Sequence, residues 1–569
     1  MYVKTTVRRR GDKEYRYLSL VEAVRTGGKN TQRTLLRLGE AGELAASGQL
    51  DRIIAALRSH AEETWLSAGE LEASGAPAVG ATAAVWAYWR RLGLDRHFAA
   101  IASRRRLDYA LGDAAFTMVA NRLIAPRSKR AMVDWVSTDV DLPHGVVAPA
   151  LDHAYWALDQ LHRAKSATEE HLYARLTDLT NLDLRLVCYD LTSTYFEGDR
   201  RPSARFASKA FGYSRDHRGD RPQVVIGLLT TSDGLPIAHH VFAGNTADVS
   251  TLPKVLEDLQ GRFGVGRIAL VADRGLVSEA NVAACAEAGF DHLLATRLHQ
   301  DNDVAAVLEA ATAPSAEWVP VPEAASAACE VTHDGRRYVV VLSAERLARD
   351  AARTAELVAR TSAELRALEL RVRDGRLADK AKIGAAAGRI LTRSGVARLF
   401  DVEVGERRFL YHYDEAALDY EEQLLAGRWV LTTSLTPAQA STAGLVVAYR
   451  RLLEVESAFR VLKDFLRLRP VYHWTEKRVR GHIAVVVIAL VIEALIEADL
   501  RRADVRDPDL PDQHLSARRA LRELGRIRKT TLEAGATTIE VVTRRSPLQA
   551  QILSALGVDA TIWDRPRIT

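Results

Sequence analysis

Residues 182–190 read Leu-Asp-Leu-Arg-Leu-Val-Cys-Tyr-Asp, an alternation of apolar and polar side chains that ends on an acid. A second run, residues 222–231, reads PQVVIGLLTT, and Gly234 then turns the chain into a third run, residues 236–243. Alternation and short apolar runs bounded by turn residues are typical of β-strands. This part of the chain therefore predicts three consecutive strands.

The next two elements complete the pattern. Residues 250–263 have the apolar spacing of an amphipathic helix, and residues 267–273 (RIALVAD) form a fourth strand, short and apolar as a buried central strand should be. Three strands, a helix and a further strand are the opening of a ribonuclease-H-like core. We therefore predict an α/β fold with a ribonuclease-H-like mixed-sheet catalytic core.

Two acids end strands of this predicted sheet. Asp190 ends the first strand and Asp273 ends the fourth. These strands lie side by side in that fold order, so the two carboxylates should meet at one edge of the sheet. Paired carboxylates attract hard divalent cations, which prefer oxygen ligands. The alternative is ordinary: Asp at a strand end often caps a turn or a helix.

A third acid lies on a predicted helix of about residues 438–467, which follows Pro437. Tyr449, Glu456 and Lys463 are spaced by seven and share one stripe of this helix, and Arg460 lies on nearly the same stripe. Glu454 points to a different face, so Glu456 is the candidate. Taken alone, Glu456 and Arg460 could be an ordinary surface pair at i,i+4 spacing.

Composition excludes several classes of protein. The chain has 569 residues, 47% of them hydrophobic, and its apolar run at residues 483–492 is too short for the ~20 residues of a membrane span. The first residues, MYVKTTVRRR, lack the apolar stretch of a secretory signal. Three distant cysteines exclude a disulfide framework and a Cys-rich zinc site, and the histidines, His482 included, have no zinc spacing with them. A cytoplasmic protein is expected, and the net charge of +5 favours nucleic acid only slightly.

The pattern changes along the chain predict six segments. Strand signals and many basic residues mark the N-terminal segment, which could be a solvated sheet or a DNA-end-binding module. The predicted segments are a small basic β-rich unit (1–48), a helical domain with possible DNA-end binding (49–180), the first part of the catalytic core (181–300), a β-rich plus helical insertion domain whose charged arm breaks near Gly375 (301–436), core helices with the glutamate (437–500) and a loosely packed basic C-terminal tail (501–569).

The link between the first two core strands is long and basic. It carries Lys209, Arg215 and Arg218, with aromatic side chains interleaved. A solvated loop is the simplest interpretation, but the density of arginine favours contact with DNA. Arg274, directly after Asp273, either contacts a phosphate or pairs with an acid of the core.

Taken in order, four motifs resemble those of the bacterial DDE transposases. They are Tyr-Asp-Leu-Thr-Ser-Thr-Tyr-Phe at 189–196, Gly-Tyr-Ser-Arg-Asp-His-Arg at 212–218, Val-Ala-Asp-Arg-Gly at 271–275 and the set Tyr449, Glu456, Phe459, Arg460 and Lys463. The chain is most similar to the insertion-sequence-four superfamily, in particular its sixteen-thirty-four-type group. The resemblance extends to the basic N-terminal hairpin and to Arg-Val-Arg-Gly-His at 478–482.

The resemblance implies that Asp190, Asp273 and Glu456 are both the catalytic residues and the metal ligands. Two Mg²⁺ ions are implied, with Mn²⁺ as a substitute. The intervals between the acids are 83 and 183 residues, and the second is long enough for the insertion domain.

The resemblance also implies contacts to DNA from Tyr449, Arg450, Arg460 and Lys463. The family's Tyr-Arg-Glu-Lys signature is incomplete because Leu452 stands at its arginine position, which puts the phosphate contact in question rather than the metal site. Arg450 or Arg451 could supply that charge from next door.

The function implied is that of an insertion-sequence transposase. It would bind terminal inverted repeats in double-stranded DNA and catalyse strand cleavage and strand transfer, by cut-and-paste through a hairpin intermediate, as a homodimer in the bacterial cytoplasm at the nucleoid. A flipped base would stack on an aromatic residue. Trp429 is a candidate for this contact, and the alternative is that Trp429 simply packs against the strand on which it lies. Two alternatives stay open: a metal-dependent nuclease without strand transfer, and a non-catalytic or domesticated DNA-binding protein.

Overall fold

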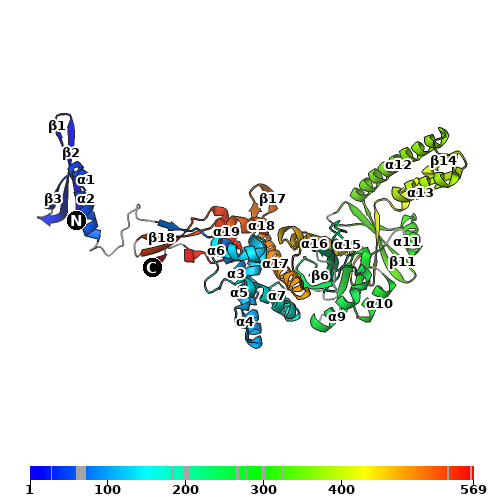
Figure 1. The fold of residues 1–569 in the computed structure, drawn as a ribbon, viewed down its shortest axis with the longest axis horizontal. Helices are drawn as coiled ribbons and strands as arrows, with labels where there is room; N and C mark the ends of the chain where they lie inside the picture. Colours follow the sequence, from blue (N-terminus) through cyan, green and yellow to red (C-terminus); the bar gives the residue numbers. More distant parts are fainter. Residues whose placement is uncertain are drawn as a thin grey trace. The chain divides into compact units, whose positions relative to one another are not determined.

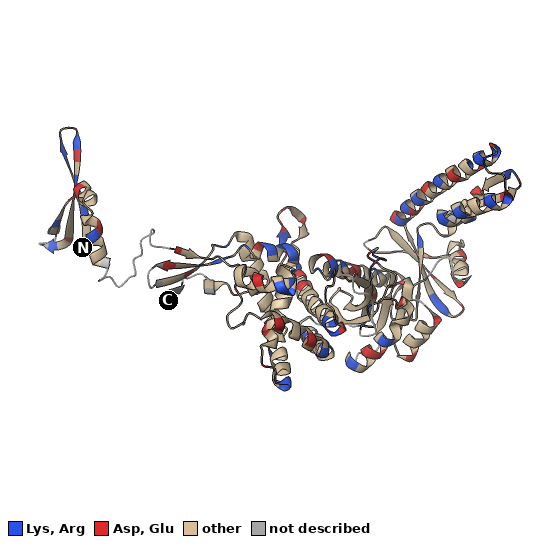
Figure 2. Ribbon diagram, in the orientation of Figure 1, with Lys and Arg blue, Asp and Glu red and all other residues tan. Residues whose placement is uncertain are grey.

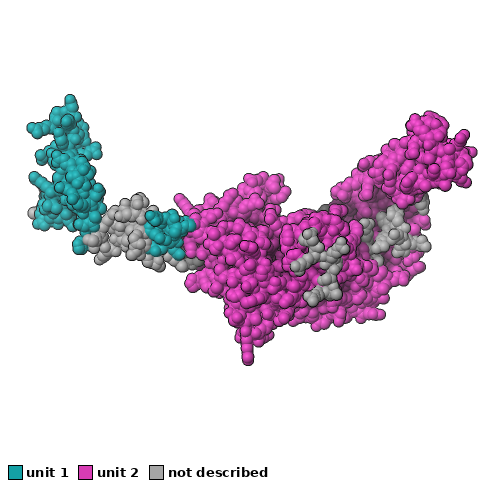
Figure 3. Space-filling model, in the orientation of Figure 1, with its two compact units in different colours: residues 1–75, 530–541, 565–569 teal, residues 76–529, 542–564 magenta. Residues whose placement is uncertain are grey.

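The fold is described from a computed structural model. The description covers residues 1–569 except 27–28, 59, 61–71, 181–184, 198–205, 264–267, 277, 297–301, 323, 535–536, 564–566 and 569. The beginning of the predicted first core strand and residues 198–205 of the basic link between the first two core strands lie outside the described residues. The chain divides into two compact units (Figure 3): residues 1–75, 530–541 and 565–569, and residues 76–529 and 542–564.

The first unit begins with the predicted β-hairpin. Strands β1 (Tyr2–Arg10), β2 (Lys13–Thr26) and β3 (Lys29–Glu40) form an antiparallel sheet in that order, followed by α1 (Ala41–Ala46) and α2 (Gln49–Arg58). Basic side chains gather along β1, whose residues are all exposed (Figure 2). A second sheet of the unit joins β4 (Glu72–Ser74), β18 (Lys529–Ala534), β19 (Thr537–Val542) and β20 (Arg567–Ile568).

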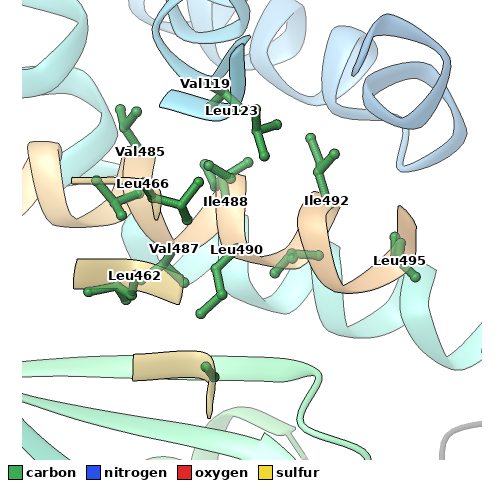
Figure 4. Packing of buried hydrophobic residues seen from close by; sticks show 14 of the residues in the cluster. Val119, Leu123, Leu462, Leu466, Val485, Val487, Ile488, Leu490, Ile492 and Leu495 are labelled. Atoms are coloured by element: carbon green, nitrogen blue, oxygen red, sulfur yellow. The ribbon is translucent and has the colours of Figure 1, made fainter. Parts of the chain in front are cut away.

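The second unit opens with the helical segment that the apolar spacing predicts. Its helices are α3 (Gly80–Arg91), α4 (Leu94–Arg105), α5 (Leu111–Ile124), α6 (Lys129–Thr138), α7 (Leu151–Arg163) and α8 (Lys165–Thr180). Of these, α3, α5 and α7 pack on α17 (Glu476–Arg502), which contains the apolar run of residues 483–492. Figure 4 shows Ile488 and Ile492 of α17 facing Val119 and Leu123 of α5. Among the described residues no helix is both long and apolar enough to cross a membrane.

A nine-stranded mixed sheet is the centre of the second unit (Figure 1). Its strand order is β10-β11-β12-β15-β9-β8-β5-β6-β7. β5 is antiparallel to β6, β6 is antiparallel to β7, and β5, β8 and β9 run parallel. The strands are β5 (Leu186–Tyr195), β6 (Gln223–Thr231), β7 (Pro236–Ala243), β8 (Ala269–Ala272), β9 (Asp291–Ala295), β10 (Trp318–Pro320), β11 (Ser326–His333), β12 (Arg336–Ser343) and β15 (Arg428–Thr433).

Side-chain alternation divides the core into the two faces of this sheet. Val187 and Tyr189 of β5 pack in a cluster with α9 (Leu252–Phe263), whereas Cys188 belongs to the larger cluster that holds α17 and the helical segment. Helices α10 (Glu279–Glu287) and α11 (Asn302–Thr312) follow β8 and β9 in the chain. Successive side chains of a strand point to opposite faces, so the face of Cys188 is also that of Asp190.

The predicted insertion is partly continuous with the sheet. β10, β11, β12 and β15 extend the central sheet, while a separate hydrophobic cluster joins the arm. The arm consists of α12 (Ala344–Arg373), α13 (Lys380–Ser394), which lies beside it (Figure 1), β13 (Phe400–Gly405), β14 (Arg408–Tyr413) and α14 (Glu415–Leu424). The predicted break at Gly375 is present, with φ at 73°.

The predictions of one long helix and of a loose C-terminal tail are wrong. The helix predicted over 438–467 is divided into α15 (Thr442–Arg450), α16 (Leu452–Arg460) and a π-helical turn, η5 (Val461–Phe465). The C-terminal segment is not a loose tail: α18 (Ala517–Leu524) buries four residues, β16 (Arg506–Asp507) pairs with β17 (Leu510–His514), and α19 (Pro547–Ala555) has a complete capping box. The polar surface of these elements masks the apolar stripe that packs inward.

Candidate active site

Asp190 and Asp273 lie on neighbouring parallel strands. Tyr189 of β5 is paired with Ala272 of β8, so the two acids occupy the next position along each strand. Asp273 ends β8 as predicted and is exposed, whereas Asp190 is half-buried. The prediction that Asp190 ends its strand is wrong: β5 continues to Tyr195 because its polar residues pair with β6 as far as Gln223.

Glu456 approaches these acids from α16, which packs on β5. Buried side chains such as Val455 and Phe459 hold the helix on the face of the sheet that also carries Cys188, and Glu456 stays exposed. Glu454 lies instead at the β6–β7 turn, where its Cβ would be 3.2 Å from a Cβ built on Gly234. Two glutamates in one helix turn therefore face different surroundings.

The electrostatics of Asp190 reflect this convergence. Burial, together with the negative charges of Asp273 and Glu456, raises the pKa of Asp190 to about 7. A hydrogen bond of 2.7 Å from the Leu191 backbone N–H to Asp190 Oδ1 opposes this rise. The positive charge of Arg215 acts in the opposite direction. Asp273 and Glu456 are thus close enough to Asp190 to disfavour its ionisation, which is the condition that a bound cation relieves.

Tyr449 lies among the same acids. Its hydroxyl donates a hydrogen bond of 3.3 Å to Asp273 Oδ1, and its pKa is raised by burial and by the charges of Asp273, Asp190 and Glu456. The ring of Trp429 lies 5.1 Å from the ring of Tyr449, at an interplanar angle of 40°. Trp429 is half-buried and packs against the main core, as the simple packing role expects.

The donor set at this position fits a divalent ion. Three carboxylates supply the oxygen ligands that hard cations prefer, and two of them are accessible to solvent. A different group of potential metal ligands in the described part of the chain has its ligand atoms within 4.8 Å of one another. It consists of Asp303 on α11, His333 at the end of β11 and Asp334 in the turn that follows. We assign no role to that group.

Lys463 and Arg215 are held in ion pairs beside the acids. Lys463 Nζ lies 2.8 Å from Asp216 Oδ1, which also accepts a hydrogen bond from Arg469. Arg215, the neighbour of Asp216, contacts Asp248 Oδ2 at 2.6 Å. Through Asp216, the described part of the basic link (residues 206–222) therefore contacts the chain that follows the glutamate helix.

Two other basic residues of the link lie against aromatic rings. Lys209 is buried, with its Nζ 5.0 Å from the ring centroid of Phe196. Arg218 contacts Asp220 at 2.8 Å and lies 5.0 Å above the ring of Tyr195. Their contact with DNA stays a prediction.

The remaining predicted DNA contacts are dispersed. Arg450 donates a hydrogen bond of 3.1 Å to Ser326 Oγ on β11, and Arg451 lies 3.9 Å from Asp233, so both arginines beside Leu452 point away from the acids. Arg460 is exposed on α16. The side chain of Arg274 lies outside the described residues.

Sequence reasoning missed the partners of the basic residues. Asp216, Asp248 and Arg469 organise the surroundings of the acids, but none is spaced regularly relative to them in the chain. Asp216 lies within the motif of residues 212–218, between Arg215 and His217. Its side chain is only 3% exposed, and this burial, which marks it as a structural ion-pair partner, is not visible in the sequence. No pattern of polar residues within a loop predicts such burial.

Comparisons with known proteins agree with these motifs. Residues 3–70 match the N-terminal domain of IS1634 family transposases, and residues 182–492, more than half of the chain, match the transposase DDE domain. A search of curated proteins found no match. Among solved structures, the chain is similar to a Mos1 transposase paired-end complex with left transposon end, at 12% identity and a TM-score of 0.14, covering 32% of this chain and 57% of that one; this likeness carries no argument.

The two matched segments include β1 to β3, all three acids and most of α17. The chain belongs to the DDE transposases, enzymes whose chemistry depends on a divalent metal ion.

Proposed function

We propose that this protein is an insertion-sequence transposase that cleaves and joins DNA at Asp190, Asp273 and Glu456. The observation that carries the proposal is the convergence of these three carboxylates, which come from β5, from the end of β8 and from α16. The sheet supports it: the order β7-β6-β5-β8-β9, with the first three strands antiparallel and the last three parallel, is what a ribonuclease-H-like core requires.

In this proposal the protein's own residues orient the reacting groups. The three carboxylates hold the metal, and Mg²⁺ is the ion we propose, two per site, with Mn²⁺ as a substitute. Bound there, the metal would lower the pKa of the attacking water or 3′-hydroxyl and offset the charge on the leaving oxygen. Tyr449 fixes Asp273 through its hydrogen bond, and Lys463 and Arg215 place positive charge beside the DNA backbone.

Finer features also belong to the proposal. The substrate is double-stranded DNA carrying the element's terminal inverted repeats, the N-terminal β-sheet with its exposed basic β1 contributes to binding the DNA end, and the working form is a homodimer with one active site for each end. Excision by cut-and-paste through a hairpin, membership of the insertion-sequence-four superfamily and a place in the cytoplasm at the nucleoid follow from the same family resemblance.

The test compares Glu456→Gln with Glu454→Gln in a Mg²⁺-dependent cleavage assay on a duplex that carries the terminal repeat. Both changes remove one negative charge from the same helix, but only Glu456 faces Asp190. We expect cleavage by the wild type and by the Glu454 variant and none by the Glu456 variant, while all three bind the DNA. Equal cleavage by both variants would mean that Glu456 is not the third acid.

The products distinguish the proposal from its alternatives. Cleavage without joined products would favour a nuclease of the same fold. Binding to the repeat without cleavage by the wild type would favour a non-catalytic DNA-binding protein.

A further inference from the structure

A second basic feature of this unit lies away from the acids. A cavity of about 530 Å³ opens between the helical segment and the chain that follows the π-helical turn. The helical segment contributes residues from α5, α6 and α7, and the other wall runs from residue 467 into the first turns of α17. Its lining holds six arginine and lysine side chains and no carboxylate: Arg122, Arg127, Lys129, Arg467, Arg469 and Arg478.

Three of these cations have no carboxylate partner in the described part of the chain. Arg122 and Lys129 are each only 5% exposed. The Arg122 guanidinium donates to the carbonyl oxygens of Leu466, Arg467 and Arg127, and its Nε has no partner. The side chain of Arg467 is exposed at the opening.

The other three cations are paired at the margin of the cavity. The pairs are Arg127 with Asp139 at 2.8 Å, Arg478 with Asp159 at 3.5 Å, and Arg469 with Asp216 and Asp464. The inner part of the lining therefore holds basic groups without an acid. Burial and the charge of Arg122 lower the pKa of Lys129, so a bound anion would favour the charged form of this lysine. Gathering buried cations without an anion is costly, so such a lining is expected where an anion binds.

Two histidines of the lining, the half-buried His473 and the buried His482, lie in the same positively charged surroundings. Burial and the charges of Lys129, Arg478 and Arg122 lower the pKa of His473 to about 3. His482 is buried and has a backbone hydrogen bond with Leu468, but its Nδ1 has no hydrogen-bond partner. His482 Nδ1 and Arg122 Nε are therefore unpaired polar atoms on residues that line a cavity of about 530 Å³, which is large enough for a phosphate and its ester groups.

The cavity is joined to the catalytic elements. Arg469 shares Asp216 with Lys463, which lies two helical turns, about 10 Å, after Glu456. Val471 is bridged to Phe196 just after the end of β5, the strand of Asp190. The wall of the cavity is therefore continuous with the elements that carry Asp190 and Glu456.

The rim of the cavity adds stacking surfaces. Tyr472 is 64% exposed and Trp474 is 54% exposed, on either side of the half-buried His473 in the chain. Aromatic faces beside a cationic groove are typical of proteins that hold unpaired nucleotides.

We propose that this cavity binds a phosphodiester of the DNA strand beside the scissile bond, with the adjacent base on Tyr472 or Trp474. Arg122, Lys129 and Arg467 supply the charge, and the aromatic rim favours a strand whose bases are unpaired. The proposal rests on the proposed function for the identity of the ligand as DNA.

The test measures DNA binding in EDTA, so that it does not depend on catalysis. Anisotropy of a labelled duplex with an unpaired end is recorded over a series of salt concentrations for the wild type, Arg467→Gln, Lys129→Met and the control Arg96→Gln. Arg96 is an exposed arginine of α4 that does not line the cavity. Arg467 is exposed as well, so its variant tests the proposal even if the Lys129 variant fails to fold.

We expect Arg467→Gln and Lys129→Met to bind about tenfold more weakly and to lose about one phosphate contact from the salt dependence, roughly 0.7–0.9 in the slope of log K against log salt. Arg96→Gln should keep the wild-type slope. Tyr472→Leu should lose the preference for an unpaired end over a blunt duplex.

Two results would overturn the proposal. The first is a wild-type slope for both cavity variants alongside normal Mg²⁺-dependent cleavage. The second is that inorganic phosphate stabilises the wild type at matched ionic strength, but not the cavity variants, while DNA binding is the same in all of them. That result would assign the cavity to free phosphate. A protein that shows the expected slopes but no cleavage would retain the cavity proposal and lose the proposed function, so the two fail separately.

Discussion

Replacing Asp216 by Asn removes the carboxylate that ties the catalytic helix to the basic link. Asp216 accepts a hydrogen bond of 2.8 Å from Lys463 and a second from Arg469. Its side chain is 3% exposed and that of Lys463 is 12% exposed, so water compensates little of the lost interaction. The variant leaves two cations facing each other beside the end of the helix that carries Glu456.

The cost follows from this burial. Removing one partner of a buried ion pair costs about 3–5 kcal/mol, because the remaining charge stays desolvated. Arg469 keeps a contact of 3.1 Å with Asp464, and only Lys463 is fully orphaned. We therefore expect a loss near the lower end, about 3 kcal/mol in the free energy of unfolding.

Urea unfolding followed by tryptophan fluorescence measures this loss, with Asp220→Asn as the control. Asp220 lies in the same link and also pairs with an arginine, but it is 60% exposed, so its variant should shift the midpoint only slightly. Adding Lys463→Met to the Asp216 variant should restore part of the loss, since it removes the orphaned charge. Equal midpoints for the Asp216 and Asp220 variants would refute the reasoning.

Three further predictions concern helix packing and protonation. Burial raises the pKa of Glu493 to about 8, so the folded protein retains a proton that the unfolded protein releases near pH 4.5, and this group makes stability fall from about pH 5 to 8. Asp190, with its pKa raised to about 7, acts in the same direction below pH 7, so Glu493→Gln should reduce the slope and remove most of it between pH 7 and 8, in urea unfolding curves measured at each pH. A Cβ on Gly481 would lie 2.0 Å from the backbone oxygen of Leu158, so Gly481→Ala should destabilise the protein by at least about 1–3 kcal/mol. Gly388 has open space around it, so Gly388→Ala should stabilise the protein by about 0.5–1 kcal/mol. Similar thermal midpoints for the two variants would contradict this prediction. Leu452→Arg, which restores the family's signature, should lower the thermal midpoint and leave cleavage no faster, because Leu452 is 6% exposed within the core; a faster and equally stable variant would disprove it.

The sheet and the two aspartates were predictable because their signals are local. Alternation identified β5, a short apolar run identified β8, and the order of strands and helix then fixed which strands are neighbours. The end of β5 was missed because Thr192, Ser193 and Thr194 look like a turn; they stay in the strand because β6 pairs with them. Tertiary pairing overrides local preference at such positions.

The C-terminal segment could not be predicted in the same way. Its strand β18 pairs with β4, so that Thr531 faces Ser74 across 457 positions of sequence. Both strands are short and polar, and β4 was assigned no strand by pattern. A pairing over this distance leaves no periodic signal in either partner, which is why the segment resembled a tail.

Leu452 illustrates how a departure from a family signature can be misread. Its position suggested that a phosphate-binding charge was missing from the helix, and that Arg450 or Arg451 replaced it. Leu452 is instead part of the buried face that holds α16 on the sheet, and both arginines are engaged elsewhere, at Ser326 and Asp233.

The positive charge that acts on Asp190 comes from Arg215, which is held in place by Asp248 on a different element. A sequence motif records which residue stands at a position of one helix, whereas the field at the acids is the sum over every element that reaches them. The signature's arginine can therefore be absent while a cation remains beside the carboxylates. The presence of Leu452 at the arginine position is thus no argument against catalysis.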